Sequence, residues 1–125
     1  MNKRSLAILV VEDNLINCIL LERVLKRNGH NVSIAQNGKE AIEANKRDEF
    51  DIILMDLMMP VMNGFDATIE IRRMSSKYIP IVAITSNVQN NEEEKCFSVG
   101  MDGFISKPIL SNQLERAFAQ VGLMF

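Results

Sequence analysis

Short apolar runs alternate with longer amphipathic stretches along most of the chain. The runs are rich in β-branched residues and apolar on both sides, which is typical of parallel strands in a sheet covered on both faces. We expect strands at residues 6–11, 31–36, 51–55, 78–84 and 103–106. The run at 31–36 instead alternates apolar and polar positions, as an edge strand does.

The stretches between the runs have the apolar spacing of helices. We expect helices at about 14–28, 37–47 and 89–99, one after Gly64, and a last one at about 110–121. Strands that alternate with helices through short connections predict a doubly wound α/β fold with right-handed crossovers.

The apolar positions of each helix predict which side packs on the sheet. In the first helix, Ile16, Leu20 and Val24 form a stripe, and Ile19 and Leu25 flank it. The other helices are expected to bury Phe65 and Ile69 in the third, Cys96, Phe97 and Val99 in the fourth, and Leu110, Leu114, Ala117, Phe118 and Val121 in the last. The fourth helix begins with a wholly polar half, so we expect its anchoring to the core to be thin.

Composition and charge exclude several classes of protein. The 125 residues are 47% hydrophobic and 24% charged, which predicts one globular domain over residues 1–125. A net charge of −2 without a basic block gives no electrostatic footprint for nucleic acid. No apolar stretch approaches the roughly 20 residues of a membrane span, and the run after the basic start is too short for a signal peptide. We therefore expect a cytoplasmic domain that makes no membrane contact.

The cysteines and the single histidine give little sign of chemistry. Cys18 and Cys96 lack metal-ligand spacing and are predicted to be free buried thiols rather than a disulfide or redox pair. His30 follows Gly29 at a turn and is predicted to lie at the surface. A zinc site or a Ser-His-Asp triad would lack partners.

Polar side chains follow four of the predicted strands at their carboxyl ends. Glu12 and Asp13 follow the first strand, Asp56 the third and Thr85 the fourth, and Lys107 comes just after the fifth. Ligands bind at this edge of open α/β sheets, so we expect one site there. Three carboxylates repel one another unless a cation lies among them, and oxygen ligands favour a hard divalent ion. The sequence therefore predicts a Mg²⁺ site, with Mn²⁺ as the alternative ion.

A divalent ion, an ammonium and a hydroxyl are together suited to hold a phosphoryl group. Asp56 is the best candidate for a nucleophile toward phosphorus, because it ends the central apolar strand and precedes a loop with Pro60 and Gly64. Asp13 is better placed as a direct metal ligand, and Glu12 would act through a water. No glycine-rich phosphate loop is present in the sequence, so ATP is not an evident donor.

Four segments carry these polar residues in a specific pattern. They are Val-Glu-Asp-Asn at 11–14, Asp-Leu-Met-Met-Pro-Val-Met-Asn-Gly at 56–64, Ile-Thr-Ser-Asn at 84–87 and Ser-Lys-Pro at 106–108. In order and spacing the segments resemble the response regulator receiver domain over essentially the whole chain. The resemblance implies a flavodoxin-like sheet of parallel strands in the order 2-1-3-4-5.

The resemblance implies a role for each residue of the site. Asp56 would accept a phosphoryl group from a phosphohistidine, and Lys107 would contact the phosphoryl oxygens. Asp13, Asp56 and the main-chain carbonyl of Met58 would hold Mg²⁺. Glu12 would reach the ion through a water.

The resemblance also implies a conformational switch. Thr85 and Phe104 match the switch pair, in which the hydroxyl swings to the phosphoryl group and the ring turns inward. Phe104 lacks the hydroxyl of the tyrosine that many members have there, and it is equally readable as a core residue. The Lys107–Pro108 peptide bond would be cis, which costs little before proline.

Two positions beside the site differ among receivers. Met58 and Asn87 stand where the lifetime of the phosphoryl group is tuned. We expect the apolar Met58 side chain to hinder the attacking water, so that an aspartyl phosphate persists for minutes or longer.

Segments at 12–17 (Glu-Asp-Asn-x-x-Asn) and 35–41 (Ala-Gln-Asn-Gly-Lys-Glu-Ala) are similar to receivers of hybrid sensor histidine kinases. The expected function is a phosphorelay switch rather than an enzyme. Its phosphodonor would be a histidine kinase or a histidine phosphotransfer protein. Phosphorylation would bias the surface of the fourth helix, fifth strand and fifth helix, and a homodimer through these two helices is an option. The chain is interpreted as the cytoplasmic receiver of such a kinase, and the kinase could be membrane-bound. The alternative is a stand-alone regulator.

Three other functions fit the sequence less well. A haloacid-dehalogenase-type phosphatase would have an Asp-x-Asp pattern after the first strand, whereas here the nucleophile candidate follows the third. A flavodoxin-like cofactor binder would need a phosphate-binding loop where Glu12 and Asp13 would repel phosphate. A receiver-like interaction module without phosphorylation has no support, because no member of the site is missing.

Overall fold

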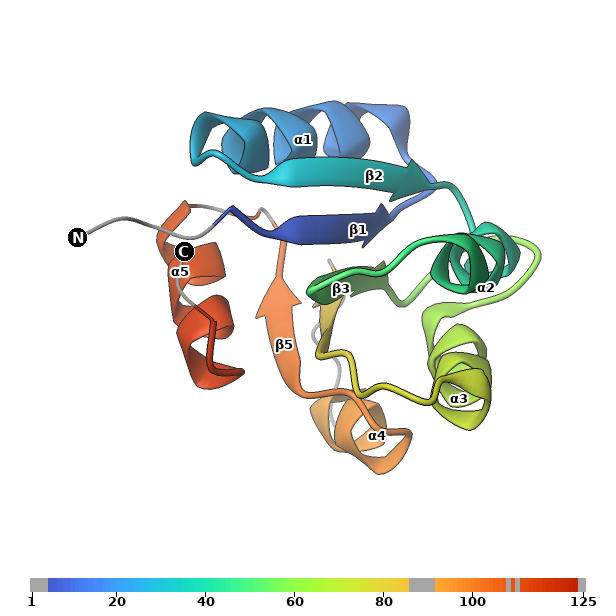
Figure 1. Cartoon of the computed structure of the whole chain (residues 1–125). Coiled ribbons are helices and arrows are strands. Elements are labelled where there is room, and N and C mark those ends of the chain that lie inside the picture. Colours follow the sequence, from blue (N-terminus) through green and yellow to red (C-terminus); the bar gives the residue numbers. More distant parts are fainter. Residues whose placement is uncertain (1–4, 86–91, 108, 110, 124–125) are drawn as a thin grey trace.

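Parallel strands form one sheet with helices on both of its faces (Figure 1). The computed structural model describes residues 5–85, 92–107, 109 and 111–123. Its elements in chain order are β1 (Ala7–Val11), α1 (Leu15–Arg27), β2 (Asn31–Ala35), α2 (Gly38–Arg47), β3 (Ile52–Asp56), α3 (Gly64–Met74), β4 (Ile81–Thr85), α4 (Glu92–Ser98), β5 (Gly103–Ser106) and α5 (Ser111–Gln120).

The strand order is β2-β1-β3-β4-β5, and every neighbouring pair is parallel. This confirms the expected doubly wound, flavodoxin-like fold. The register also aligns the carboxyl ends of the inner strands, since Val11 pairs with Met55 and Asp56 pairs with Ile84. β2 lies at the edge, and its alternating exposure confirms the expected edge strand.

Some elements begin or end a few residues from the expected positions. β4 begins at Ile81 rather than at residue 78, and Ile81 is the first residue of the strand that pairs with β3, opposite Ile53. The strands β3 and β4 include Asp56 and Thr85 as their last residues. The expected start of the fourth helix at residue 89 lies outside the described residues.

Each face of the sheet has its own apolar layer. Residues of α1 and α5 cover one face, and residues of α2, α3 and α4 cover the other. The largest fully buried side chains come mostly from the strands, and they include Ile8, Leu9, Ile52, Ile53, Leu54, Met55 and Ile81. This burial on both faces is the physical reason for the apolar runs in the sequence. Both cysteines are buried and free, as predicted.

The predicted inward face of α1 is only partly right, because Leu25 is buried and Val24 is partly buried as expected, while the rest of the stripe faces outward. The helix buries Cys18, Leu21 and Leu25, while Ile16 is 68% exposed and Leu20 is 54% exposed. The thiol of Cys18 donates to the carbonyl oxygen of Glu12 at 3.2 Å, which turns the Cys18 face of the helix toward the end of β1. Apolar residues occur all round the first turns of this helix, so their spacing did not identify the buried face.

Two other inward assignments are wrong. Ile69 on α3 is 45% exposed, because the helix buries Ala67, Thr68 and Ile71 instead. Phe97 on α4 is 50% exposed, which leaves one buried side chain among the described residues of that helix. Leu110, expected in the last helix, lies outside the described residues.

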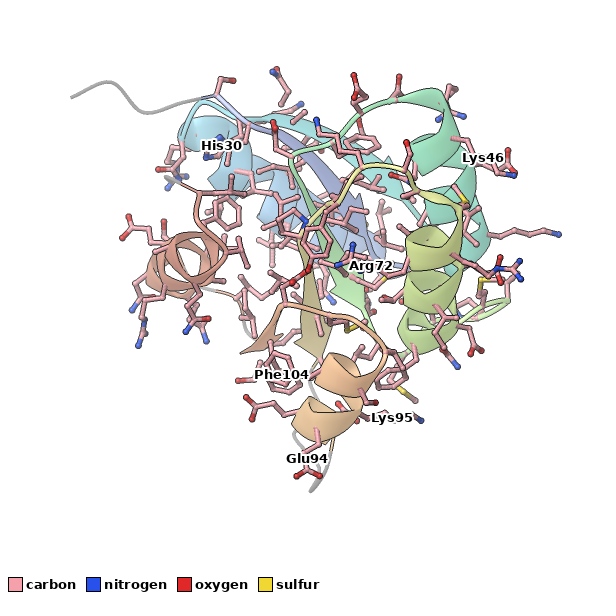
Figure 2. The ribbon with its side chains drawn as sticks, turned by 60° about the horizontal axis from the view of Figure 1, so that its bottom comes forward. His30, Lys46, Arg72, Glu94, Lys95 and Phe104 are labelled. Carbon is pink, nitrogen blue, oxygen red and sulfur yellow. The ribbon has the colours of Figure 1, made fainter. Side chains whose placement is uncertain are left out.

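His30 is buried, not at the surface as predicted (Figure 2). Its Nδ1 accepts a hydrogen bond from the amide of Leu6 at 3.1 Å, and its ring lies 6.0 Å from the ring of Phe118. The imidazole therefore joins the start of β1 to α5. In the part of the chain that the structure describes, no helix is both long and apolar enough to cross a membrane.

Candidate functional site

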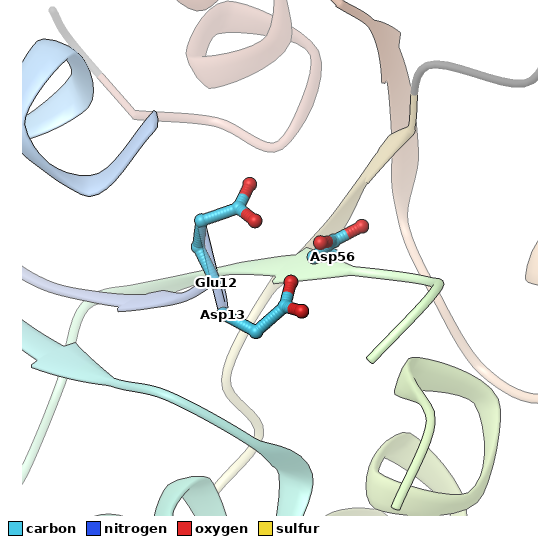
Figure 3. Close-up of side chains that lie close together, drawn as sticks. All are labelled: Glu12, Asp13 and Asp56. Atoms are coloured by element: carbon cyan, nitrogen blue, oxygen red, sulfur yellow. The ribbon is translucent and has the colours of Figure 1, made fainter. Parts of the chain in front are cut away.

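Three carboxylates meet at the carboxyl edge of the sheet (Figure 3). Glu12 and Asp13 follow β1, and Asp56 ends β3 beside it. One oxygen from each of the three lies within 4.8 Å of the others. Glu12 and Asp56 are almost fully buried, whereas Asp13 is exposed to solvent. The sequence therefore predicted this cluster correctly.

Local backbone bonds hold the first two acids in place. The amide of Glu12 donates to the carbonyl of Ala35, which extends the pairing between β1 and β2 by one residue. Asn14 caps α1 by accepting a hydrogen bond from the amide of Asn17, and its own amide donates to Glu12 Oε2 at 3.1 Å. Asp13, between Glu12 and the capping Asn14, is exposed at the rim of the site, and its carboxylate remains near the other two.

Lys107 brings the positive charge predicted for this edge. Its Nζ lies 2.8 Å from Glu12 Oε1 and 3.5 Å from Asp56 Oδ2, and its side chain is 17% exposed. The amide of Lys107 donates to the carbonyl of Thr85 at 2.7 Å, so the end of β4 positions the lysine. Thr85 itself is buried at the last position of β4.

The pKa values of the site reflect burial of its charged groups first and excess negative charge second. Burial raises the pKa of Asp56 to about 7, and the adjacent Glu12 carboxylate adds to the rise. Burial also acts to raise the pKa of Glu12, but hydrogen bonds from Lys107 and Asp56 hold it below the usual value. Burial acts to lower the pKa of Lys107, yet the two acids hold it above its usual value. One ammonium therefore does not neutralise the buried acids.

The donor set suits a hard divalent cation. All three groups are carboxylates, two of them buried beside a third that is open to water, which leaves an entry path and room for bound waters. An added dication would also relieve the repulsion that raises the pKa of Asp56. The residues present thus fit Mg²⁺.

The loop after Asp56 is tightly constrained. The amide of Met58 donates to Asp56 Oδ1 at 3.3 Å, and the amide of Gly64 donates to the carbonyl of Leu57 at 3.1 Å. A Cβ atom on Gly64 would lie 2.3 Å from the carbonyl oxygen of Asp56, so only glycine fits there. The Met58 side chain is 65% exposed beside the site.

Of the remaining predicted residues, the structure describes Phe104. Phe104 on β5 is partly buried against the apolar layer under α2, α3 and α4, and it pairs in the ladder with Ala83 (Figure 2). Asn87 and Pro108, with the predicted cis bond, lie outside the described residues.

Sequence reasoning missed an apolar surface next to the site. Leu15, Ile16 and Leu20 are each more than half exposed on the first turns of α1. A small cavity of about 90 Å³ lies where this helix meets the site, between Leu20 and Lys107. The sequence does indicate this surface, because the helix contains more apolar residues than a single face can bury.

Comparison with known sequences identifies the family. The model of the response regulator receiver domain family matches residues 8–119. The chain is 39% identical over 119 residues to hybrid signal transduction histidine kinase B of Dictyostelium discoideum, covering 86% of this chain and 6% of that protein. It is 34% identical over 140 residues to histidine kinase 5 of Arabidopsis thaliana, covering 90% of this chain and 15% of that protein. The chain thus spans a small part of the length of these relatives.

Solved structures agree with the sequence relatives. The receiver domain of the sensor histidine kinase PA1611 from Pseudomonas aeruginosa, solved with a magnesium ion in its active-site cleft, superposes with a TM-score of 0.85, 34% identity and coverage of 95% of this chain and 99% of that one. The receiver of Saccharomyces cerevisiae Ssk1, solved with the phosphotransfer protein Ypd1, gives a TM-score of 0.82, 28% identity and coverage of 91% and 86%. With its sheet order and its carboxylate cluster, this chain belongs to the family of response regulator receiver domains.

Proposed function

We propose that the domain accepts a phosphoryl group from a phosphohistidine onto Asp56 and works as a phosphorelay switch. The observation that carries the proposal is the position of Asp56, a buried carboxylate beside Glu12 and Lys107 at the carboxyl edge of the sheet. The site around Asp56 consists mainly of charged side chains. Such a site is better suited to accepting a phosphoryl group than to turnover of a separate substrate. We therefore propose a switch rather than an enzyme.

The proposed transfer is an in-line displacement at phosphorus. An Asp56 oxygen forms a bond to phosphorus while the bond from phosphorus to the donor imidazole nitrogen breaks, and that nitrogen keeps the electron pair. Lys107 contacts the transferred phosphoryl oxygens after turning from Glu12. Bound Mg²⁺, or Mn²⁺ in its place, would neutralise charge on those oxygens.

The proposed ion ligands are those of the carboxylate cluster and its loop. Asp13, Asp56 and the main-chain carbonyl of Met58 hold the ion, and Glu12 contributes through a water. The arrangement is supported by the hydrogen bond from the Met58 amide to Asp56, which keeps this part of the loop against the carboxylate.

The donor class is a histidine kinase or a histidine phosphotransfer protein. The Ssk1 receiver was solved with such a phosphotransfer protein, and the curated relatives are histidine kinases. We propose that the exposed apolar face of α1, formed by Leu15, Ile16 and Leu20, is covered when the donor binds. Leu20 of this face lines the small cavity together with Lys107 and Glu12. The proposed setting is the cytoplasmic part of a hybrid kinase, as a single domain without nucleic-acid or membrane contact.

The proposed output is the surface of α4, β5 and α5. Thr85 moves toward the phosphoryl group and the half-buried ring of Phe104 follows it inward. α4 suits a movable element, because Cys96 alone is fully buried among its described residues. A homodimer through α4 and α5 is a further possibility for this surface.

Met58 is proposed to lengthen the phosphorylated state by shielding the acyl phosphate from water. Its exposed side chain lies on the loop directly after Asp56. Decay of the phosphorylated mass should be faster in Met58→Ala than in the wild type, and equal rates would remove this role.

Intact-mass measurement after incubation with acetyl phosphate and Mg²⁺ tests the function. We expect one added phosphate in the wild type, none when Mg²⁺ is chelated beforehand, and none in Asp56→Asn. Asp51→Asn is the matched control, because Asp51 lies ahead of β3 at the opposite end of that strand and accepts a hydrogen bond from the Ala7 amide. Folded wild-type protein that gains no mass, either from acetyl phosphate or from a phosphohistidine donor, would favour the unphosphorylated interaction module.

A further inference from the structure

The first turn of α2 lies against the loop that follows Asp56. The amide of Gly38 donates to the carbonyl oxygen of Met62 at 3.3 Å, and Gly38 is buried in this contact. A Cβ atom on Gly38 would lie 2.8 Å from that oxygen and 2.9 Å from Ala67 Cβ. The close approach therefore requires a residue without a side chain.

The loop needs such support because it is strained. Val61 has a φ of 70°, a left-handed conformation that is unfavourable for a β-branched residue. The amide of Met62 donates to the carbonyl of Pro60 at 2.7 Å, which closes a tight turn around Val61. A turn of this kind persists only where its surroundings hold it. The hydrogen bond from α2 to Met62 is one such restraint, at the exit of the turn.

Helix formation does not explain a glycine at this position. Asn37 already caps α2, accepting a hydrogen bond from the amide of Glu40, and Gly38 is absent from the described residues with positive φ. Alanine is a better helix former than glycine in a first turn. If only the helix mattered, Gly38→Ala would be neutral or stabilising.

We propose that Gly38 is a positioning residue for the phosphoacceptor site. The Gly38 amide donates to the Met62 carbonyl, and the absence of a side chain lets the two backbones approach this closely. Through the turn, this contact keeps the backbone of Met58 beside Asp56. The inference rests on the proposed function in one respect, which is that the Met58 carbonyl is a Mg²⁺ ligand. An alanine would push the Met62 carbonyl away, and the displacement would pass along the loop to that ligand.

The test compares Gly38→Ala with Ala44→Gly in the Mg²⁺-free protein and during titration with Mg²⁺. Ala44 lies near the other end of α2 and is also buried, so its substitution weakens the same helix without touching Met62. Calorimetry should give Mg²⁺ binding about tenfold weaker in Gly38→Ala, the size typical of a lost supporting contact around a metal site. The amide NMR shifts of Met58 and Asn63 should move in Gly38→Ala and stay in place in Ala44→Gly.

Two results would overturn the proposal. The first is a Gly38→Ala variant that binds Mg²⁺ within about twofold of the wild-type affinity, a smaller change than the loss of a supporting contact causes, and that leaves the Met58 and Asn63 amide shifts unmoved. The other is an equal loss of affinity in Ala44→Gly. If the Gly38→Ala variant does not fold, a double variant that also carries Ala67→Gly removes the Ala67 Cβ atom, the second atom that the new methyl group would crowd. That double variant should fold and still bind Mg²⁺ weakly, and wild-type affinity would refute the role.

The outcomes also separate this inference from the proposed function. A wild type that binds Mg²⁺ but takes up no phosphate would refute phosphoryl acceptance, while the Mg²⁺ titration would still decide the role of Gly38. A wild type that binds no Mg²⁺ would refute both.

Discussion

The Lys107 ammonium lies closer to Glu12 than to Asp56, at 2.8 Å against 3.5 Å. Glu12 is fully buried, and its other carboxylate oxygen accepts a hydrogen bond from the Asn14 amide. Lys107 therefore neutralises the acid that is most deeply enclosed, and Asp56 keeps a raised pKa of about 7. This division of charge underlies the first two predictions.

Removing the Lys107 charge should destabilise the metal-free protein. We expect Lys107→Met to lower the free energy of unfolding by about 2–3 kcal/mol at pH 8, because it leaves buried carboxylates without their cation. Urea denaturation in the presence of a chelator measures this. Lys46→Met is the matched control, since its pair with Glu43 is more than half exposed and should contribute within about 0.5 kcal/mol. Equal effects of the two substitutions would contradict the description of Lys107 as the neutralising cation.

Asp56 should make the metal-free protein less stable as pH rises. Its pKa in the folded protein is about 7, above the usual 3.8, so between these values the folded state binds a proton that the unfolded state has lost. Stability is therefore lost progressively from about pH 4 to pH 7. Asp56→Asn removes this cost and should be more stable than the wild type by a few kcal/mol at pH 8, with little difference near pH 4.

Chemical denaturation of both proteins at the two pH values, with a chelator present, checks the dependence on pH. Mg²⁺ binding ionises Asp56, so its affinity for the wild type should also rise between pH 6 and pH 8. A variant no more stable than the wild type at pH 8 would mean that Asp56 is not held at a raised pKa.

The exposed apolar face of α1 should matter for a protein donor more than for a small one. Ile16→Ser should slow transfer from a phosphorylated histidine phosphotransfer protein about tenfold, as the loss of an apolar anchor does. Uptake from acetyl phosphate, which has no docking surface, should change far less. Ile69→Ser on α3 is the control, because Ile69 is also exposed but lies on another helix. Donor transfer that is equally fast in the two variants would exclude α1 as the docking face.

Arg72 joins α3 to the segment ahead of β5 (Figure 2). It donates to Asp102 Oδ2 at 2.8 Å and to the carbonyls of Gly100 and Ile79, and its guanidinium lies over the ring of Tyr78. Substitution to methionine should lower the free energy of unfolding by about 2–3 kcal/mol, because it leaves partly buried acceptors unpaired.

Arg73 provides the comparison for this prediction. Its side chain is 76% exposed and its pair with Glu70 is local to α3, so Arg73→Met should change stability by about 0.5 kcal/mol or less. Thermal or urea unfolding of the two variants decides the matter. Similar losses would show that the Arg72 contacts contribute nothing beyond those of a surface arginine.

The alternation of β-branched runs and helices was enough to predict the sheet, because burial on both faces leaves a strong pattern. The positions of Glu12, Asp13 and Asp56 followed from topology, since parallel strands end at one edge. The buried face of α1 did not follow, because apolar residues lie on more than one side of that helix and their spacing does not single out Cys18, Leu21 and Leu25. The burial of His30 did not follow either, because its contacts with the Leu6 amide and the Phe118 ring come from residues distant in the sequence.

Reduction of the acyl phosphate tests the central claim most directly. The protein is incubated with acetyl phosphate and Mg²⁺, reduced with borohydride, which converts an aspartyl phosphate to homoserine, and digested for peptide sequencing by mass spectrometry. We predict homoserine at position 56 and at neither Asp13 nor Asp51. Homoserine at another acid, or a phosphorylated protein without any, would contradict the assignment of Asp56 as the phosphoacceptor.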